Sequence, residues 1–181
     1  MLLKYRLLLA VLCTLVAAAY SADVEHPFKK ANIGDWVEYK TSNDMGGMKT
    51  EMGMKQTLIA KTEEEATMEI TTKMMGRDMK QEVKIKLNEK YDPIKQMAQG
   101  DVKPKLLGEG DESITVGGKT FKAHWTQYEI DMKTPQMQMT MKSKVWVAPA
   151  EVPLGGMVKT ETQMGEMGKS TTELKDFGKG K

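Results

Sequence analysis

The chain has 181 residues, of which 27 are Lys or Arg and 25 are Asp or Glu, so its net charge is only +2. This balance argues against nucleic acid as a partner, because neutralising phosphates requires an excess of basic residues on one face. The length is sufficient for one domain of ordinary size with its own hydrophobic core.

The first 21 residues have the features of a signal peptide. Lys4 and Arg6 precede an apolar run, residues 7–19, that is short for a membrane span. The small residues Ala19 and Ser21 on either side of Tyr20 suit cleavage, and residues 17–19 (AAA) are the other option. A retained membrane anchor is the alternative interpretation. Leu12 stands where lipid attachment to Cys13 would require a small residue, so we expect no lipidation. Removing this segment leaves 25 basic and 25 acidic residues, no cysteine for a disulfide and no transmembrane span.

The remaining chain, residues 22–181, is predicted to form a single antiparallel β domain. Apolar and polar residues alternate in segment after segment, as in residues 137–147, and this period of two is typical of strands with one apolar face. Turn signals separate these segments at residues 43–47, 61–64, 75–78, 117–118, 133–135 and 164–168. We therefore expect a mainly β fold: a single large curved sheet of about nine strands, forming a half-barrel or open barrel.

Two stretches depart from simple alternation. Residues 93–98 could form one or two helical turns in the middle crossover, with Pro93 at the first helical position. After Gln127 the apolar positions change parity, from Phe121 and Trp125 to Tyr128 and Ile130. Such a change predicts either a β-bulge or a strand that passes from one environment to another.

Several strand-and-turn segments resemble those of a known group of proteins. The segments are residues 34–39 (GDWVEY), 114–123 (ITVGGKTFKA), 145–147 (VWV) and 152–159 (VPLGGMVK). Together they are similar to secreted bacterial proteins of uncharacterised function whose fold is like that of the periplasmic lipoprotein carriers. The resemblance implies a half-open barrel with an apolar concave face and a role in binding apolar ligands. It implies no catalytic residues.

Methionine is the most unusual feature of the composition, with sixteen residues after the signal segment. Many occupy alternate strand positions, where β-branched residues fit better, so they are expected to fill the core or line a cavity. Flexible thioether side chains also suit a surface that adapts to varied apolar ligands. The predicted ligand-binding residues of the concave face are Met52, Met54, Met68, Phe121, Trp125, Met137, Met139 and Met141.

A second group of methionines flanks the predicted turns. In a simple meander the first and third turns lie at the same end of the sheet, which would gather Met45, Met48, Met75 and Met79. Thioether clusters select soft ions, so this group is a candidate Cu(I) site, and ordinary loop methionines are the alternative. We expect no other cofactor.

The sequence contains no phosphate-binding loop, nucleophile elbow or paired histidines at zinc spacing, and we expect no enzyme activity. The main hypothesis is an exported protein, periplasmic or secreted, that binds a lipid or another hydrophobic small molecule. The alternatives are a structural or envelope-interaction protein without a small ligand, and a periplasmic copper-binding protein.

Overall fold

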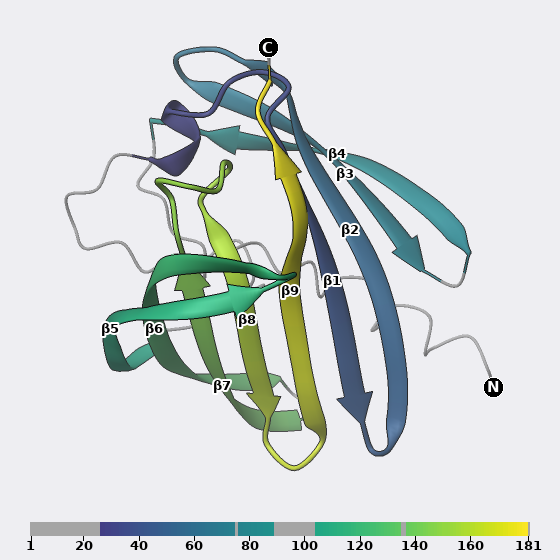
Figure 1. The fold of residues 1–181 in the computed structure, drawn as a ribbon. Helices are drawn as coiled ribbons and strands as arrows, with labels where there is room; N and C mark the ends of the chain where they lie inside the picture. The colour runs from purple at the N-terminus through teal and green to yellow at the C-terminus, as the bar shows by residue number, and fades with distance from the viewer. Residues whose placement is uncertain (1–25, 75, 89–103, 135–136, 181) are drawn as a thin grey trace.

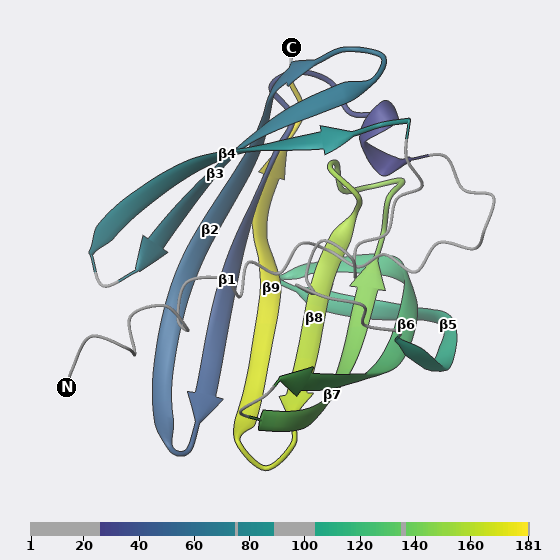
Figure 2. The ribbon, with the colours of Figure 1, turned by 180° about the vertical axis from the view of Figure 1, so that it is seen from behind.

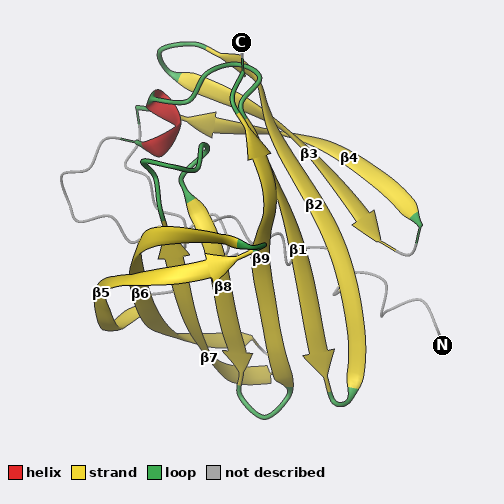
Figure 3. Ribbon diagram, in the orientation of Figure 1, coloured by secondary structure: helices red, strands yellow, loops and turns green. Residues whose placement is uncertain are grey.

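A computed structural model describes residues 26–74, 76–88, 104–134 and 137–180. In these residues the structure is almost entirely β, with one short 3-10 helix, η1 (Figure 1, Figure 3). The elements are η1 (Pro27–Lys29), β1 (Trp36–Met45), β2 (Met48–Lys61), β3 (Glu65–Met74), β4 (Arg77–Lys86), β5 (Lys105–Val116), β6 (Lys119–Thr134), β7 (Met137–Val147), β8 (Met157–Met164) and β9 (Gly168–Gly178). The expected helix at 93–98, the signal segment and Met75 lie outside the described residues.

The nine strands form one antiparallel sheet in the order β4-β3-β2-β1-β9-β8-β7-β6-β5. Two meanders, β1–β4 and β5–β9, therefore meet where the first strand pairs with the last, and the edge strands β4 and β5 do not pair with each other. The sheet curves strongly and stays open (Figure 1, Figure 2). This confirms the predicted fold class.

The turns follow the chemistry that the sequence indicated. Gly117 and Gly118, between β5 and β6, both have positive φ values, 58° and 78°. Two such residues match the right-handed twist of the paired strands, and glycine adopts this conformation without steric cost. The tip of this hairpin lies beside β9, because a Cβ added at Gly117 would be 3.5 Å from the Leu174 carbonyl oxygen.

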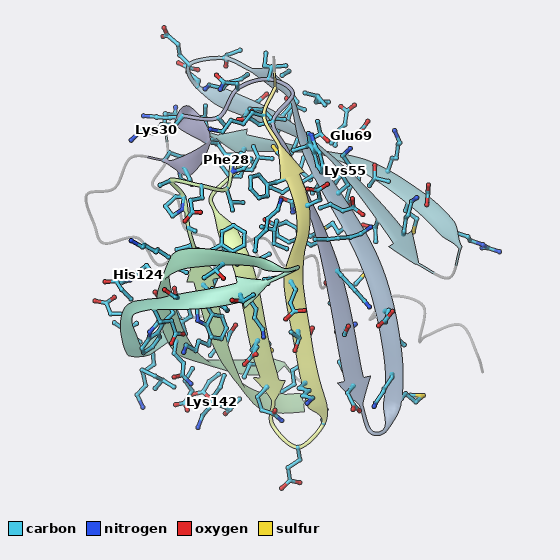
Figure 4. All side chains as sticks on the ribbon, in the orientation of Figure 1. Phe28, Lys30, Lys55, Glu69, His124 and Lys142 are labelled. Atoms are coloured by element: carbon cyan, nitrogen blue, oxygen red, sulfur yellow. The ribbon has the colours of Figure 1, made fainter. Side chains whose placement is uncertain are left out.

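The hydrophobic core lies toward the end of the sheet opposite the β1–β2 and β8–β9 turns. Its largest fully buried apolar side chains are Tyr39, Leu58, Met68, Ile70, Leu87 and Met157. Phe28 of η1 points into this core while Lys30 points away (Figure 4). Lys61 holds η1 in place by donating hydrogen bonds of 2.6 Å to the Lys29 and Ala31 carbonyl oxygens.

The change of parity in β6 has a clear structural origin. β6 pairs with β7 without a register shift, whereas β5 shifts register between Leu106 and Gly108, opposite Gln127 and Tyr128. Phe121 and Tyr128 are both buried although they lie on opposite faces of the same strand. β6 therefore passes from one environment to another, which is one of the two alternatives predicted from the sequence. The register shift itself lies in its partner strand, β5.

Candidate ligand-binding face

Side chains on the core face of the sheet form rows that cross several strands, because antiparallel register places them opposite one another. Beyond the apolar core comes a threonine row, which comprises Thr41, Thr172, Thr160, Val145 and Thr126. Next comes a hydroxyl row, which comprises Asn43, Ser170, Thr162, Ser143 and Tyr128. At the far end a methionine rim comprises Met48, Met45, Met164 and Met141, with Gly168 between Met45 and Met164.

In the threonine row, hydroxyl groups are paired. The Thr41 and Thr172 hydroxyl oxygens are 2.9 Å apart, and the Thr160 hydroxyl donates to the Met157 sulfur at 3.0 Å. All three threonines are buried. Buried hydroxyl groups with partners are tolerated well, so this row is a stable polar layer beneath the next one.

The hydroxyl row is only partly paired. The hydroxyl oxygens of Ser143 and Thr162 are 3.1 Å apart, and the Asn43 side-chain amide nitrogen donates to the Thr50 hydroxyl oxygen at 3.4 Å. The Asn43 Oδ1 and Ser170 Oγ atoms are buried and make no hydrogen bond within the described part of the chain. Ser170 is only 3% exposed, and each buried polar group without a partner costs about 1–3 kcal/mol.

The electrostatics of the hydroxyl row favour neutral groups. Burial raises the pKa of Tyr128 to about 12; the nearby Thr126 hydroxyl acts in the opposite direction, and the Glu109 carboxylate adds to the rise. Tyr128 is thus uncharged at neutral pH. None of the side chains that form the threonine row, the hydroxyl row and the methionine rim carries a charge.

Charged groups are abundant on the opposite face, where they form ion pairs. Lys159 contacts Glu161 at 2.9 Å and Glu173 at 3.1 Å. Burial tends to lower the pKa of Lys159, but these two carboxylates outweigh it and raise the pKa. Lys142 also lies on this side of the sheet, away from the core (Figure 4). The two faces therefore differ sharply in charge.

Trp125 belongs to this charged face and not to the predicted ligand-binding face. Its ring lies against Gly110 and below the Lys144 ammonium group, which is 4.2 Å from the ring centroid of Trp125 and 4.5 Å from that of Trp146. The Trp146 indole N–H donates a hydrogen bond to Glu112, which lowers the pKa of that carboxyl. Tyr128 lies three positions after Trp125, an odd offset, so the two side chains point to opposite faces of the strand.

The other predicted ligand-binding residues do not form one surface: some are buried in the core, and others are half-buried on the face of the sheet. Met54 and Met68, 4% and 2% exposed, are sealed in the core. Phe121 is buried too, with its ring centroid 6.4 Å from that of Phe177. Met52 is half-buried opposite Thr41, and Met141 is half-buried in the methionine rim. Met137 and Met139 belong to β7, but their side chains lie outside the described residues.

Three of the four methionines predicted to bind copper are described, and the structure does not gather them at one place. Met45 and Met48 face each other across the β1–β2 turn, but Met79 lies opposite Thr72 on β3. Pairing between β2 and β3 ends at Gly53, five residues from Met48, which corresponds to about 17 Å along the strand. The sequence did not indicate that β2 would be so much longer than β3. In Figure 1 the turn between β1 and β2 lies at the bottom of the sheet, whereas the hairpin of β3 and β4 extends to the right, away from it.

Among the described residues, no group of three or more His, Cys, Asp or Glu side chains is placed to hold a metal ion. The same residues contain no helix that is long and apolar enough to cross a membrane.

The hydroxyl row was not predicted from the sequence. A signal was present in β8, where Thr160 and Thr162 alternate with Lys159, Glu161 and Gln163, but in β9 another threonine, Thr171, separates Ser170 from Thr172. Hydroxyl-bearing residues are equally common on a solvated face, so periodicity alone could not assign them to the inside of the sheet.

The fold belongs to the class of curved, open antiparallel sheets, and no family model and no curated protein matches the sequence. One similar structure is a protein of Bacteroides fragilis, classed as exported and described as having a YmcC-like fold. It is 12% identical, with a TM-score of 0.56 over 82% of this chain and 97% of that one. A protein of Parabacteroides distasonis, classed as a lipoprotein, is 15% identical with a TM-score of 0.51 over 81% and 96%.

At such low identity these structures show the shared fold alone. Neither is described as a lipoprotein carrier. The resemblance to the carriers therefore stays a prediction, whereas the resemblance to bacterial proteins classed as exported or as lipoproteins agrees with the sequence analysis.

Proposed function

We propose that this protein is an exported, non-enzymatic binding protein that holds an amphiphilic ligand on the core face of its sheet. The observation that carries the proposal is the buried Ser170 hydroxyl without a hydrogen-bond partner, in the same row as the unpaired Asn43 Oδ1. Polar groups buried in a stable protein normally have partners, and a ligand in contact with this row would supply them.

The neighbouring side chains support a ligand with an apolar part. The methionine rim lies next to the hydroxyl row, and its exposed members Met45 and Met48 can adapt to varied apolar shapes. Export is supported by the signal-like residues 1–21 and by the classification of the two structural neighbours as an exported protein and a lipoprotein.

The test is the binding of a neutral apolar fluorescent probe, N-phenyl-1-naphthylamine, to the purified protein. We expect saturable fluorescence enhancement, weakened by Met141→Lys, which puts a charge in the methionine rim. Lys142→Met is the matched control on the opposite face and should bind as the wild type does. Absence of saturable binding by the folded wild type, together with no co-purified lipid in an organic extract, would leave only the structural or envelope-interaction role.

A further inference from the structure

The hydrogen-bonding groups of the hydroxyl row define which ligand atoms can complete them. Asn43 Oδ1 can only accept a hydrogen bond, and its amide nitrogen already donates to Thr50. A ligand that satisfies Asn43 must therefore present an O–H or N–H donor. The Ser170 and Tyr128 hydroxyl groups can each donate or accept, so hydroxyl groups of a ligand suit them equally well.

The same row is unsuited to an anion. A negatively charged group buried there would need a cation, and the three rows contain none. The lysines of the adjoining strands, including Lys142, Lys144 and Lys159, project to the opposite face, where they contact glutamates. The Glu109 carboxylate acts on Tyr128 and would repel an anion placed beside it.

The order of the rows fixes the orientation of the ligand. On one side of the hydroxyl row, the threonine row and the core are filled by the protein's own side chains, such as Thr41 and Tyr39 at 2% and 0% exposure. On the other side lies the methionine rim, where Met45 and Met48 are 36% and 73% exposed. An apolar chain attached to a group in the hydroxyl row can therefore extend only toward the rim.

We propose that the ligand is an uncharged amphiphile with a hydroxyl-bearing head, whose head contacts Asn43 and Ser170 and whose apolar tail lies along the methionine rim. This inference rests on the proposed function, since it names the class of ligand for the same face. It also sets the selectivity: a neutral head with donors is preferred to a carboxylate, a phosphate or a head that has acceptors alone.

The inference is tested by displacement of N-phenyl-1-naphthylamine with three ligands that share one acyl chain. The ligands are 1-monopalmitoylglycerol, palmitate and methyl palmitate, which offer a dihydroxy head, an anionic head and a neutral head without donors. We expect monopalmitoylglycerol to bind about tenfold more tightly than methyl palmitate, since roughly one net hydrogen bond to a buried group separates them. Palmitate should bind no more tightly than the methyl ester.

Two variants locate the preference. Asn43→Leu with Ser170→Ala removes the unpaired acceptor and hydroxyl, so it should abolish the preference for monopalmitoylglycerol while methyl palmitate binds as before or better. Thr41→Val, in the fully paired threonine row, should keep the wild-type preference.

The outcomes separate the two proposals. Equal displacement by all three ligands, tightest binding of palmitate, or displacement by none of them overturns the inference about the head group but leaves the probe-binding function in place. A preference that survives in the Asn43→Leu, Ser170→Ala variant also overturns it. Failure of the probe itself to bind refutes the proposed function.

Discussion

The Thr41–Thr172 contact offers a quantitative test of the polar layers on the core face. Both side chains are buried, at 2% and 1% exposure, and their hydroxyl oxygens are 2.9 Å apart across β1 and β9. Valine has the shape of threonine without the hydroxyl. Thr41→Val therefore removes one partner and leaves the Thr172 hydroxyl without this bond, while the packing changes little.

The expected free energies follow from this geometry. Thr41→Val should lower the free energy of unfolding by about 1–3 kcal/mol, the cost of depriving a buried polar group of its partner. Thr172→Val should cost at least as much, because Thr172 makes a further interaction besides the one with Thr41. The double variant should be less destabilised than the sum of the two, with a coupling energy of about 1 kcal/mol or more.

The assay is urea unfolding of the four proteins, followed by tryptophan fluorescence and by circular dichroism to verify a two-state transition. The slopes should be equal, so that changes in the midpoint report stability alone. Additivity within about 0.3–0.5 kcal/mol would show that the two hydroxyl groups do not interact, and it would refute the row arrangement derived from strand register.

Two further predictions concern a glycine and a tyrosine. Gly178→Ala should destabilise the protein by about 1–3 kcal/mol, because the new Cβ would clash with the Trp36 ring, lying 2.8 Å from its Cε2 atom. Gly53→Ala, with its Cβ 3.7 Å from the Lys73 Cβ, should be neutral or stabilising by about 0.5–1 kcal/mol in the same urea assay. Because the pKa of Tyr128 is about 12 in the folded protein and near 10 in the unfolded chain, its contribution to stability should be complete below pH 10 and disappear as the pH rises to 12. The free energy of unfolding of the wild type should therefore fall relative to that of Tyr128→Phe as the pH rises over this interval, and a difference that stays constant with pH would contradict the raised pKa.

Local features of the fold could be predicted well from the sequence. The alternation of Trp36 and Glu38 with Val37 and Tyr39 gave the correct two faces of β1, since burial follows the period of the strand. The turn at 117–118 was equally clear because of its paired glycines. These signals depend only on neighbours in the chain.

The candidate site depends on partners that are distant in the sequence. Ser170 is assigned to the hydroxyl row by its register with Asn43 and Thr162, which no local pattern determines. The copper hypothesis was built on an assumed equal length of neighbouring hairpins, and the five-residue extension of β2 past Gly53 removed that premise. Trp125 was placed on the wrong face because both faces of β6 bury apolar side chains.

The pairing of β1 with β9 has a consequence for how the chain acquires its structure. The hydroxyl groups of Thr41 and Thr172 meet across 131 residues, and the Gly180 amide donates to Asp35 at 2.7 Å across 145. Until β9 is available, β1 keeps one edge without a partner, so the two meanders cannot join before nearly all the chain is present. Linking the ends beside β1 and β9 and opening the chain between β4 and β5 would convert the order into a continuous nine-strand meander, β5 to β9 followed by β1 to β4. With its longest-range pairing made local, such a circular permutant should fold faster than the natural connectivity.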